Sequence, residues 1–172
     1  MMLSLVLTAG AAWADNGDIP GSGLTWDLTN GVLTISGNGA MPDNTRPWAL
    51  PNGEYLIKSI VIKEGVTRIG NQAFRRNWSL GSVTIPNTVT SIGNNAFENC
   101  SAMKEITIPD SVESIGNDAF YECYTLDKVT IGSGVKSIDD NAFRDCRWLS
   151  NFILKVPPYS SDGQTLKFGN DI

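Results

Sequence analysis

The feature that most restricts the fold of this chain is a repeat with a fixed period of 23 residues, which runs through positions 66–157. Four copies follow one another without an insertion, so each apolar position recurs as a column. One such column consists of Phe74, Phe97, Phe120 and Phe143. A single unit has too few apolar side chains to close a core, whereas stacked units bury a continuous one. The period therefore predicts a solenoid.

Each unit is expected to contribute one strand to a parallel sheet. A glycine column follows the strands, and we expect a positive φ at these glycines. A column of three asparagines and one aspartate precedes the Ala-Phe pair and predicts the N-cap of a single helical turn; calcium binding by the stacked oxygens is the alternative. The strands are predicted at residues 57–62, 82–85, 105–108, 128–131 and 151–154, the glycines are Gly70, Gly93 and Gly116, and the polar column is Asn71, Asn94, Asn117 and Asp140.

Ahead of the repeat the pattern changes to an alternation with period two. Apolar residues alternate with polar ones between positions 24 and 36, on both sides of Asn30-Gly31. Asn-Gly between alternating runs predicts a β-hairpin. We expect this hairpin to cap the first coil, whose core and strand edge would otherwise face water. Trp48 is expected to lay its indole over the same end of the core.

Residues 1–14 form an apolar run that ends in Ala12-Trp13-Ala14, the small-x-small form of a signal peptidase site. No Lys or Arg precedes the run, and a buried terminal strand is the alternative. The run is too short to span a membrane. We therefore expect a protein that is secreted or displayed on the cell surface, whose mature chain does not insert into a membrane.

The charge and the residue content exclude several classes of function. A net charge of −5 with scattered basic residues leaves no face for nucleic acid. The chain has no histidine, which removes histidine-dependent nucleophiles, histidine-ligated zinc and the side chain best suited to proton transfer near neutral pH. The carboxylates Asp118, Asp139 and Asp140 fall in cap and turn columns. We expect a non-enzymatic protein that uses neither a cofactor nor a metal.

The three cysteines, Cys100, Cys123 and Cys146, occupy one column of the repeat, in which Asn77 stands in the first unit. This spacing lacks the paired CxxC arms of a zinc site. We interpret the cysteines as small apolar filler in a tight interior column. A disulfide between neighbouring coils is the alternative, because stacked strands lie about 4.8 Å apart.

The unit Ile-Pro-x-x-Val-x-x-Ile-Gly-x-x-Ala-Phe-x-x-Cys-x-x-Leu-x-x-Ile-x-Ile resembles the BspA-type leucine-rich repeat of bacterial surface proteins. Its clearest copies are residues 85–108 and 108–131. The resemblance implies a right-handed parallel solenoid used for binding. The fold class is therefore an α/β repeat solenoid, a leucine-rich-repeat superhelix with short helical turns and an N-terminal hairpin cap. Common leucine-rich repeats have an asparagine where this chain has Thr88, Ser111 and Gly134, so no asparagine ladder is expected there.

These patterns divide the chain into four parts. Residues 1–14 are the signal peptide, residues 15–56 the hairpin cap and a loop, and residues 57–157 the solenoid. Residues 158–172 lack the repeat and form an irregular tail or a partial repeat. Either the chain is a fragment or its last coil is poorly protected.

Binding residues are sought where the repeat does not determine the side chain. The strand column of Thr84, Thr107 and Thr130 is typical of plain β-propensity, and three members are too few for an ice-binding array. The turn before each strand varies more and carries residue types enriched at interface hot spots. The candidate ligand-binding residues in this turn are Arg75, Trp78, Tyr121, Tyr124, Arg144, Arg147 and Trp148. The alternative is structural, with both tryptophans shielding the ends of the core.

We therefore predict a binding or adhesion module that recognises an extracellular protein or a glycan through its solenoid surface. A structural spacer in a cell-envelope protein is the alternative. Glycan hydrolysis would require turnover that depends on Asp139 or Asp140. The sequence leaves the ligand, the oligomeric state and the mode of surface attachment open.

Overall fold

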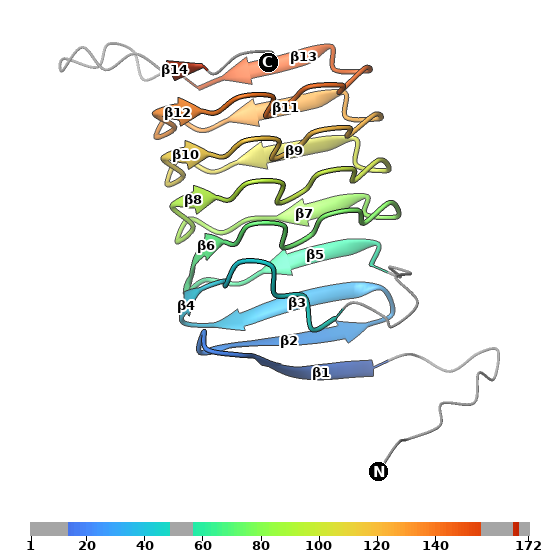
Figure 1. Ribbon diagram of the computed structural model, residues 1–172, viewed down its shortest axis with the longest axis vertical. Helices are drawn as coiled ribbons and strands as arrows, with labels where there is room; N and C mark the ends of the chain where they lie inside the picture. The colour runs from blue at the N-terminus through green and yellow to red at the C-terminus, as the bar shows by residue number, and fades with distance from the viewer. Residues whose placement is uncertain (1–13, 49–56, 156–166, 169–172) are drawn as a thin grey trace.

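The computed structural model describes residues 14–48, 57–155 and 167–168. In these residues the chain winds into a β-solenoid whose coils stack along the long axis of the molecule (Figure 1). Each coil contributes a long strand to one face, a short strand to a second sheet, and a strandless stretch of turns to a third face, which we call the turn face. The expected signal peptide lies outside the described residues, apart from its last residue.

The strands fall where the repeat predicts them. The face with long strands contains two sheets, ordered β1-β2-β3-β5-β7 and β13-β11-β9, and the short strands form a sheet ordered β14-β12-β10-β8-β6-β4. The long-strand face consists of β1 (Ala14–Ile19), β2 (Leu24–Thr29), β3 (Val32–Gly37), β5 (Ser59–Ile62), β7 (Ser82–Thr84), β9 (Glu105–Ile108), β11 (Lys128–Ile131) and β13 (Asn151–Leu154). The short strands are β4 (Gly39–Ala40), β6 (Val66–Ile69), β8 (Ser91–Ile92), β10 (Ser114–Ile115), β12 (Ser137–Ile138) and β14 (Lys167–Phe168).

Neighbouring coils of the repeat pair in parallel at the period of the sequence. Val129 in β11 pairs with Ile106 in β9 and with Phe152 in β13. In the second sheet, Ile115 pairs with Ile92 and Ile138. A constant period keeps each column on one face, since a slip of one residue would turn every side chain to the other face. The predicted stacking of 23-residue units is confirmed.

The two strands on either side of Asn30-Gly31 form the hairpin that the sequence predicts. Asn30 and Gly31 have φ angles of 52° and 81°, both in the left-handed region that a type I′ turn requires. β3 then pairs in parallel with β5, so the hairpin and the solenoid share one sheet. The sequence did not predict β1, which pairs antiparallel with the outer side of β2. The role of this unit as a cap stays a prediction.

The described residues contain no helix, so the expected helical turns are not confirmed. Non-glycine residues in the left-handed region recur instead at two places in each coil. Backbone N–H groups near them donate to the next coil, as Phe74 does to the carbonyl of Ala96 at 2.8 Å and Arg76 to that of Glu98 at 2.7 Å. A helix would have used such N–H groups within one coil. The left-handed columns are Gln72, Asn95, Asp118 and Asn141, with φ of 54–57°, and Arg76, Asn99, Glu122 and Asp145, with φ of 57–62°.

Glycine is needed in the glycine column for a reason other than the expected one. Gly70, Gly93 and Gly116 do not have a positive φ, so that prediction is wrong. A Cβ at Gly93 would lie 2.5 Å from Oδ1 of Asn71 in the preceding coil. The close approach of two coils therefore demands glycine here.

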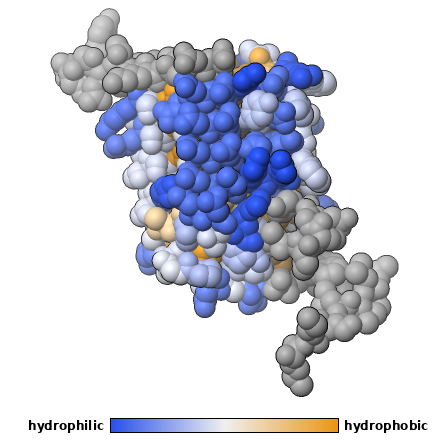
Figure 2. Space-filling model, viewed as in Figure 1, coloured by the Kyte–Doolittle hydropathy of each residue, from blue (hydrophilic) through white to orange (hydrophobic). Residues whose placement is uncertain are grey.

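The asparagine column connects coils and caps no helix in the described residues. Oδ1 of Asn71 accepts a hydrogen bond from the backbone N–H of Asn94 at 2.8 Å, and Oδ1 of Asn94 accepts one from Asn117 at 3.1 Å. Oδ1 of Asp43 does the same for Asn71 at 2.8 Å. These bonds lie on the turn face, where hydrophilic side chains form a continuous band along the molecule (Figure 2).

An aromatic stack runs through the core from one end to the other. Trp48 is buried, as predicted, and lies 5.5 Å between ring centroids from Phe74. The phenylalanine column continues at spacings of 5.3, 5.3 and 5.0 Å, and all four rings are buried. Phe152 meets the last ring edge-on. This stack gives neighbouring coils a shared apolar contact.

The cysteine column is buried, and all three thiols are free. Each thiol donates to the carbonyl oxygen of a phenylalanine in the preceding coil, for example from Cys100 Sγ to Phe74 O at 3.3 Å. At the start of the column, Asn77 donates from Nδ2 to the same oxygen at 2.9 Å, but within its own coil. The interpretation as interior filler is confirmed.

Candidate binding surface

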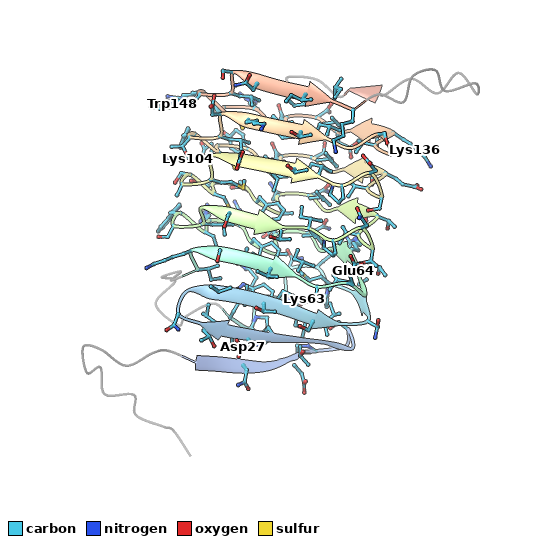
Figure 3. All side chains as sticks on the ribbon, turned by 180° about the vertical axis from the view of Figure 1, so that it is seen from behind. Asp27, Lys63, Glu64, Lys104, Lys136 and Trp148 are labelled. Carbon is cyan, nitrogen blue, oxygen red and sulfur yellow. The ribbon has the colours of Figure 1, made fainter. Side chains whose placement is uncertain are left out.

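The predicted binding residues lie at one edge of the solenoid, between the turn face and the long strands. Trp148 and Lys104 project from this edge, and Lys136 projects from the opposite one (Figure 3). Backbone hydrogen bonds join successive coils here, including Asn99 N–H to Tyr121 O at 2.7 Å. The stacking therefore brings the seven predicted residues onto one edge. We call this edge the rim and define it as residues 75–79, 98–102, 121–125 and 144–148.

Arg75 is held by an ion pair with the next coil. Its Nε lies 2.7 Å from Oε2 of Glu98, and its Nη2 lies 2.8 Å from Oε1. Glu98 is only 7% exposed and also accepts a hydrogen bond from Asn95 Nδ2 at 2.8 Å. Such a two-point pair has both charge and geometric specificity. Arg75 therefore contributes to the contact between coils as well as to the rim.

Glu122 lies near Tyr121 and Tyr124 and raises the pKa of both phenols. Asn99 Nδ2 also donates to Glu122 Oε2 at 2.9 Å. The negative charge of Glu122 raises the pKa of Tyr121. Partial desolvation, followed by the hydrogen bond to Glu122, raises the pKa of Tyr124. Both phenols therefore stay protonated as hydrogen-bond donors well above neutral pH.

The two arginines of the last rim coil are differently engaged. Arg147 places its guanidinium 5.3 Å from the centroid of the Tyr124 ring, within the range of a cation–π contact. Its Nε also lies 3.6 Å from Oδ1 of Asp145. Arg144 donates more weakly, from Nη1 to Oδ1 of Asn141 at 3.5 Å. Tyr124 and Arg147 thus form a joined pair on adjacent coils.

Trp78 and Trp148 are the most solvent-exposed large apolar residues of the described chain. Trp78 is 55% exposed and Trp148 is 71% exposed, whereas Trp26 and Trp48 are buried. More than half of the surface of each rim tryptophan therefore lies in water.

Sequence analysis missed the acidic members of the rim. Glu98 pairs with Arg75, and Glu122 accepts a hydrogen bond from Asn99 and raises the pKa of Tyr121 and Tyr124. A signal was available, because Arg75 and Glu98 are 23 residues apart, as are Asn99 and Glu122. Opposite charges or complementary polar groups one period apart indicate contact between coils.

The strand column of threonines is regular but has charged neighbours. Thr107 pairs with Thr130 across β9 and β11, and in the same strands Glu105 pairs with Lys128. A charged pair on the same outward side of the sheet interrupts the uniform surface that an ice-binding array needs. The column therefore keeps its interpretation as solvent-facing strand.

Two kinds of feature are absent from residues 14–48, 57–155 and 167–168. There, no three His, Cys, Asp or Glu side chains gather closely enough to hold a metal ion. Nor does that part of the chain contain a helix long and apolar enough to cross a membrane.

This fold and its repeat define a leucine-rich repeat protein. Residues 52–159 match the family described as "BspA type Leucine rich repeat region" in six copies, and the chain belongs to this family. Leucine-rich repeat proteins are typically binding modules without enzymatic activity. No curated protein matches the chain.

Solved structures of bacterial leucine-rich repeat proteins are similar. One from Eubacterium ventriosum is 26% identical, with a TM-score of 0.61 over 83% of this chain and 44% of that chain. A leucine-rich cell surface protein from Faecalibacterium prausnitzii is 22% identical, with a TM-score of 0.59 over 83% of this chain and 40% of that one. A leucine-rich repeat protein of T. pallidum is 21% identical, with a TM-score of 0.50 over 89% and 86%. This chain thus spans less than half the length of the first two.

Proposed function

We propose that this chain is a binding module that acts at a cell surface and engages an extracellular partner through the rim. The observation that carries the proposal is the exposure of Trp78 and Trp148, at 55% and 71%. Tryptophan, tyrosine and arginine contribute most of the free energy at many protein interfaces. A chain that needed only to fold would gain nothing by leaving two indoles in water.

The organisation of the polar rim residues supports the same function. Glu122 accepts a hydrogen bond from Asn99, and Arg147 rests against the ring of Tyr124. Side chains that are already ordered lose less conformational entropy when a partner binds. The rim is therefore a better binding surface than free side chains of the same types would be.

A location outside the cell is part of the proposal. The apolar run of residues 1–14 with its small-x-small end supports export. The solved structure from Faecalibacterium prausnitzii is described as a cell surface protein, which supports the same location for this chain.

The competing function is that of a spacer without a ligand. The ion pair of Arg75 with Glu98 supports the spacer function, because the contact between coils is sufficient to explain that pair. A spacer needs no partner for Trp78 or Trp148, and substitution of these residues would then change stability alone. The two functions therefore differ in a measurable outcome.

The test measures binding of residues 15–172 to immobilised matrix proteins, mucins and glycans by biolayer interferometry. A rim variant combines Trp78→Ala, Tyr124→Ala, Arg147→Ala and Trp148→Ala. A matched control replaces four exposed residues elsewhere, through Thr84→Ala, Glu105→Ala, Lys128→Ala and Lys136→Ala. Circular dichroism establishes that each protein is folded.

Saturable binding by the wild type and the control, with a loss of about tenfold or more in the folded rim variant, is the expected result. Binding that survives in the rim variant would place the partner on another face. Absence of binding by folded wild-type protein to the whole panel would favour the spacer.

A further inference from the structure

The rim carries three aromatic side chains whose spacing suits one kind of ligand. We propose that it binds an extended, neutral oligosaccharide whose sugar rings stack on Trp78, Tyr124 and Trp148. This inference rests on the proposed function and names the class of ligand.

The positions of the three rings follow from the repeat. Trp78 and Tyr124 occupy one column two coils apart, and Trp148 lies one coil further on in the adjacent column. Coils stacked at about 4.8 Å place the first two positions roughly 10 Å apart. Each sugar of an extended β-linked oligosaccharide advances by about as much as one coil. A chain parallel to the solenoid axis would thus meet rings at its first, third and fourth sugars.

The coil between Trp78 and Tyr124 has small side chains. Ser101 and Ala102 stand in the two columns that carry aromatic residues elsewhere, and both are half-buried. The backbone there is held by Thr125, whose Oγ1 lies 2.7 Å from the carbonyl oxygen of Ser101. The second rim coil therefore leaves room for a ligand to pass from one aromatic ring to the next.

Several charged groups of the rim already have partners within it, which favours an uncharged ligand. Arg147 lies against Asp145 and the ring of Tyr124, and Glu122 accepts a hydrogen bond from Asn99. A charged ligand would have to compete with these internal partners. Sugar hydroxyls instead share them, because a guanidinium keeps further donors and a carboxylate keeps further acceptors. The apolar C–H face of a sugar ring packs against an aromatic face.

The first test is calorimetric titration of residues 15–172 with hexasaccharides of β-linked glucose and of β-linked N-acetylglucosamine. A heparin hexasaccharide is the charged comparison. We expect saturable binding of a neutral hexasaccharide, quenching of rim tryptophan fluorescence, and little change in affinity between low and high salt, since screening acts on charges. Preference for heparin, with affinity that falls as salt rises, would overturn the inference.

Variants then separate stacking from other causes. Trp78→Ala and Trp148→Ala are each expected to weaken binding about tenfold, as is Tyr124→Ala, whereas Tyr124→Phe should keep most of the affinity because it keeps the ring. Ser101→Arg should block binding by filling the second coil. Lys136→Ala, at the opposite edge (Figure 3), is the control that should bind like wild type. Equal affinities of Tyr124→Ala and Tyr124→Phe, or full affinity in Ser101→Arg, would contradict this placement.

The results also distinguish failure of this inference from failure of the proposed function. If folded wild type binds neither neutral hexasaccharide but binds a protein in a rim-dependent way, the oligosaccharide is wrong and the binding function stands. If it binds nothing on either panel, both are wrong.

Discussion

Replacement of Phe97 by alanine should remove the central link of the aromatic stack. Phe97 is fully buried, and its ring centroid lies 5.3 Å from that of Phe74 and 5.3 Å from that of Phe120. Truncation of a buried phenylalanine costs about 3–5 kcal/mol of unfolding free energy. Because two stacked neighbours lose contact, we expect a value in the upper half of that range, about 4–5 kcal/mol. Domains of this size are stable by only about 5–15 kcal/mol, so the variant would be close to unfolding.

Phe143→Ala is the matched comparison at the end of the stack. Phe143 stacks on Phe120 at 5.0 Å, but its other neighbour is Phe152, which meets it edge-on at 5.3 Å. Since stability in a solenoid is a sum over neighbouring units, a change at the end disturbs fewer contacts. We expect a loss of about 3 kcal/mol there, and of about 1–2 kcal/mol for Phe97→Leu, which keeps much of the apolar volume.

Urea unfolding followed by far-ultraviolet circular dichroism measures these losses. Tryptophan fluorescence adds a second probe, to which Trp48, stacked on Phe74 at the start of the column, contributes. If Phe97→Ala cost no more than Phe143→Ala, with unchanged denaturant dependence, the stack would not act as a continuous core. If Phe97→Ala lowered the free energy of unfolding by less than about 2 kcal/mol, the expected cost of removing this ring would be wrong.

Two further outcomes are expected. Gly93→Ala should lower the melting temperature and reduce the free energy of unfolding by about 1–3 kcal/mol, because its Cβ would lie 2.5 Å from Oδ1 of Asn71. Gly81→Ala, whose Cβ would lie 3.6 Å from the carbonyl oxygen of Lys58, should be neutral or slightly stabilising. A Gly93→Ala protein as stable as Gly81→Ala would contradict the close approach of the two coils. Burial raises the pKa of Cys100 and Cys146 from 9.0 to about 12. As the pH rises, the unfolded chain therefore releases the thiol protons before the folded chain does, and the free energy of unfolding should fall between about pH 9 and pH 12. At pH 10 the loss is about 1.4 kcal/mol per thiol. Denaturant unfolding across that range should show a smaller decline when both cysteines are replaced by alanine, and an unchanged decline would mean that these thiols are not its cause.

Columns of like residues made the strands and the inward side chains predictable. Phe97 and Cys123 are buried because their columns recur at one period, and that period is a property of the sequence itself. The hairpin was also predictable, since Asn30-Gly31 is a local signal. Features that depend on one short segment or on strict periodicity could thus be read from the chain.

The conformation of the turn face could not be predicted in the same way. Asn95 and Asp118 belong to residue types that tolerate a left-handed backbone, but Arg76 and Glu122 do not favour it. Their conformation is maintained by hydrogen bonds to the adjacent coil. The need for glycine at Gly93 likewise comes from a neighbouring coil. The backbone preference of a single residue type does not reveal such contacts between coils.

The residue types of the rim could be predicted from the sequence, but their partners could not. Arg75 was singled out for recognition, whereas the structure pairs it with Glu98 at 2.7 Å. Tyr121 and Tyr124 are predicted binding residues, but the pattern does not reveal Glu122, which raises the pKa of both phenols. The pair of Arg75 with Glu98 becomes visible only when side chains one period apart are compared across coils.

The rim backbone shows why side chains can vary on a constant fold. Arg76, Asn99, Glu122 and Asp145 share φ angles of 57–62° although their side chains differ in charge and shape. A left-handed conformation costs a non-glycine residue about 1–2 kcal/mol. Backbone hydrogen bonds between coils, such as Arg76 N–H to the carbonyl of Glu98 at 2.7 Å, offset that cost whichever side chain is present. Since the fold constrains the backbone and not the side chain at these positions, the side chains of the rim can be substituted while the coils keep their geometry.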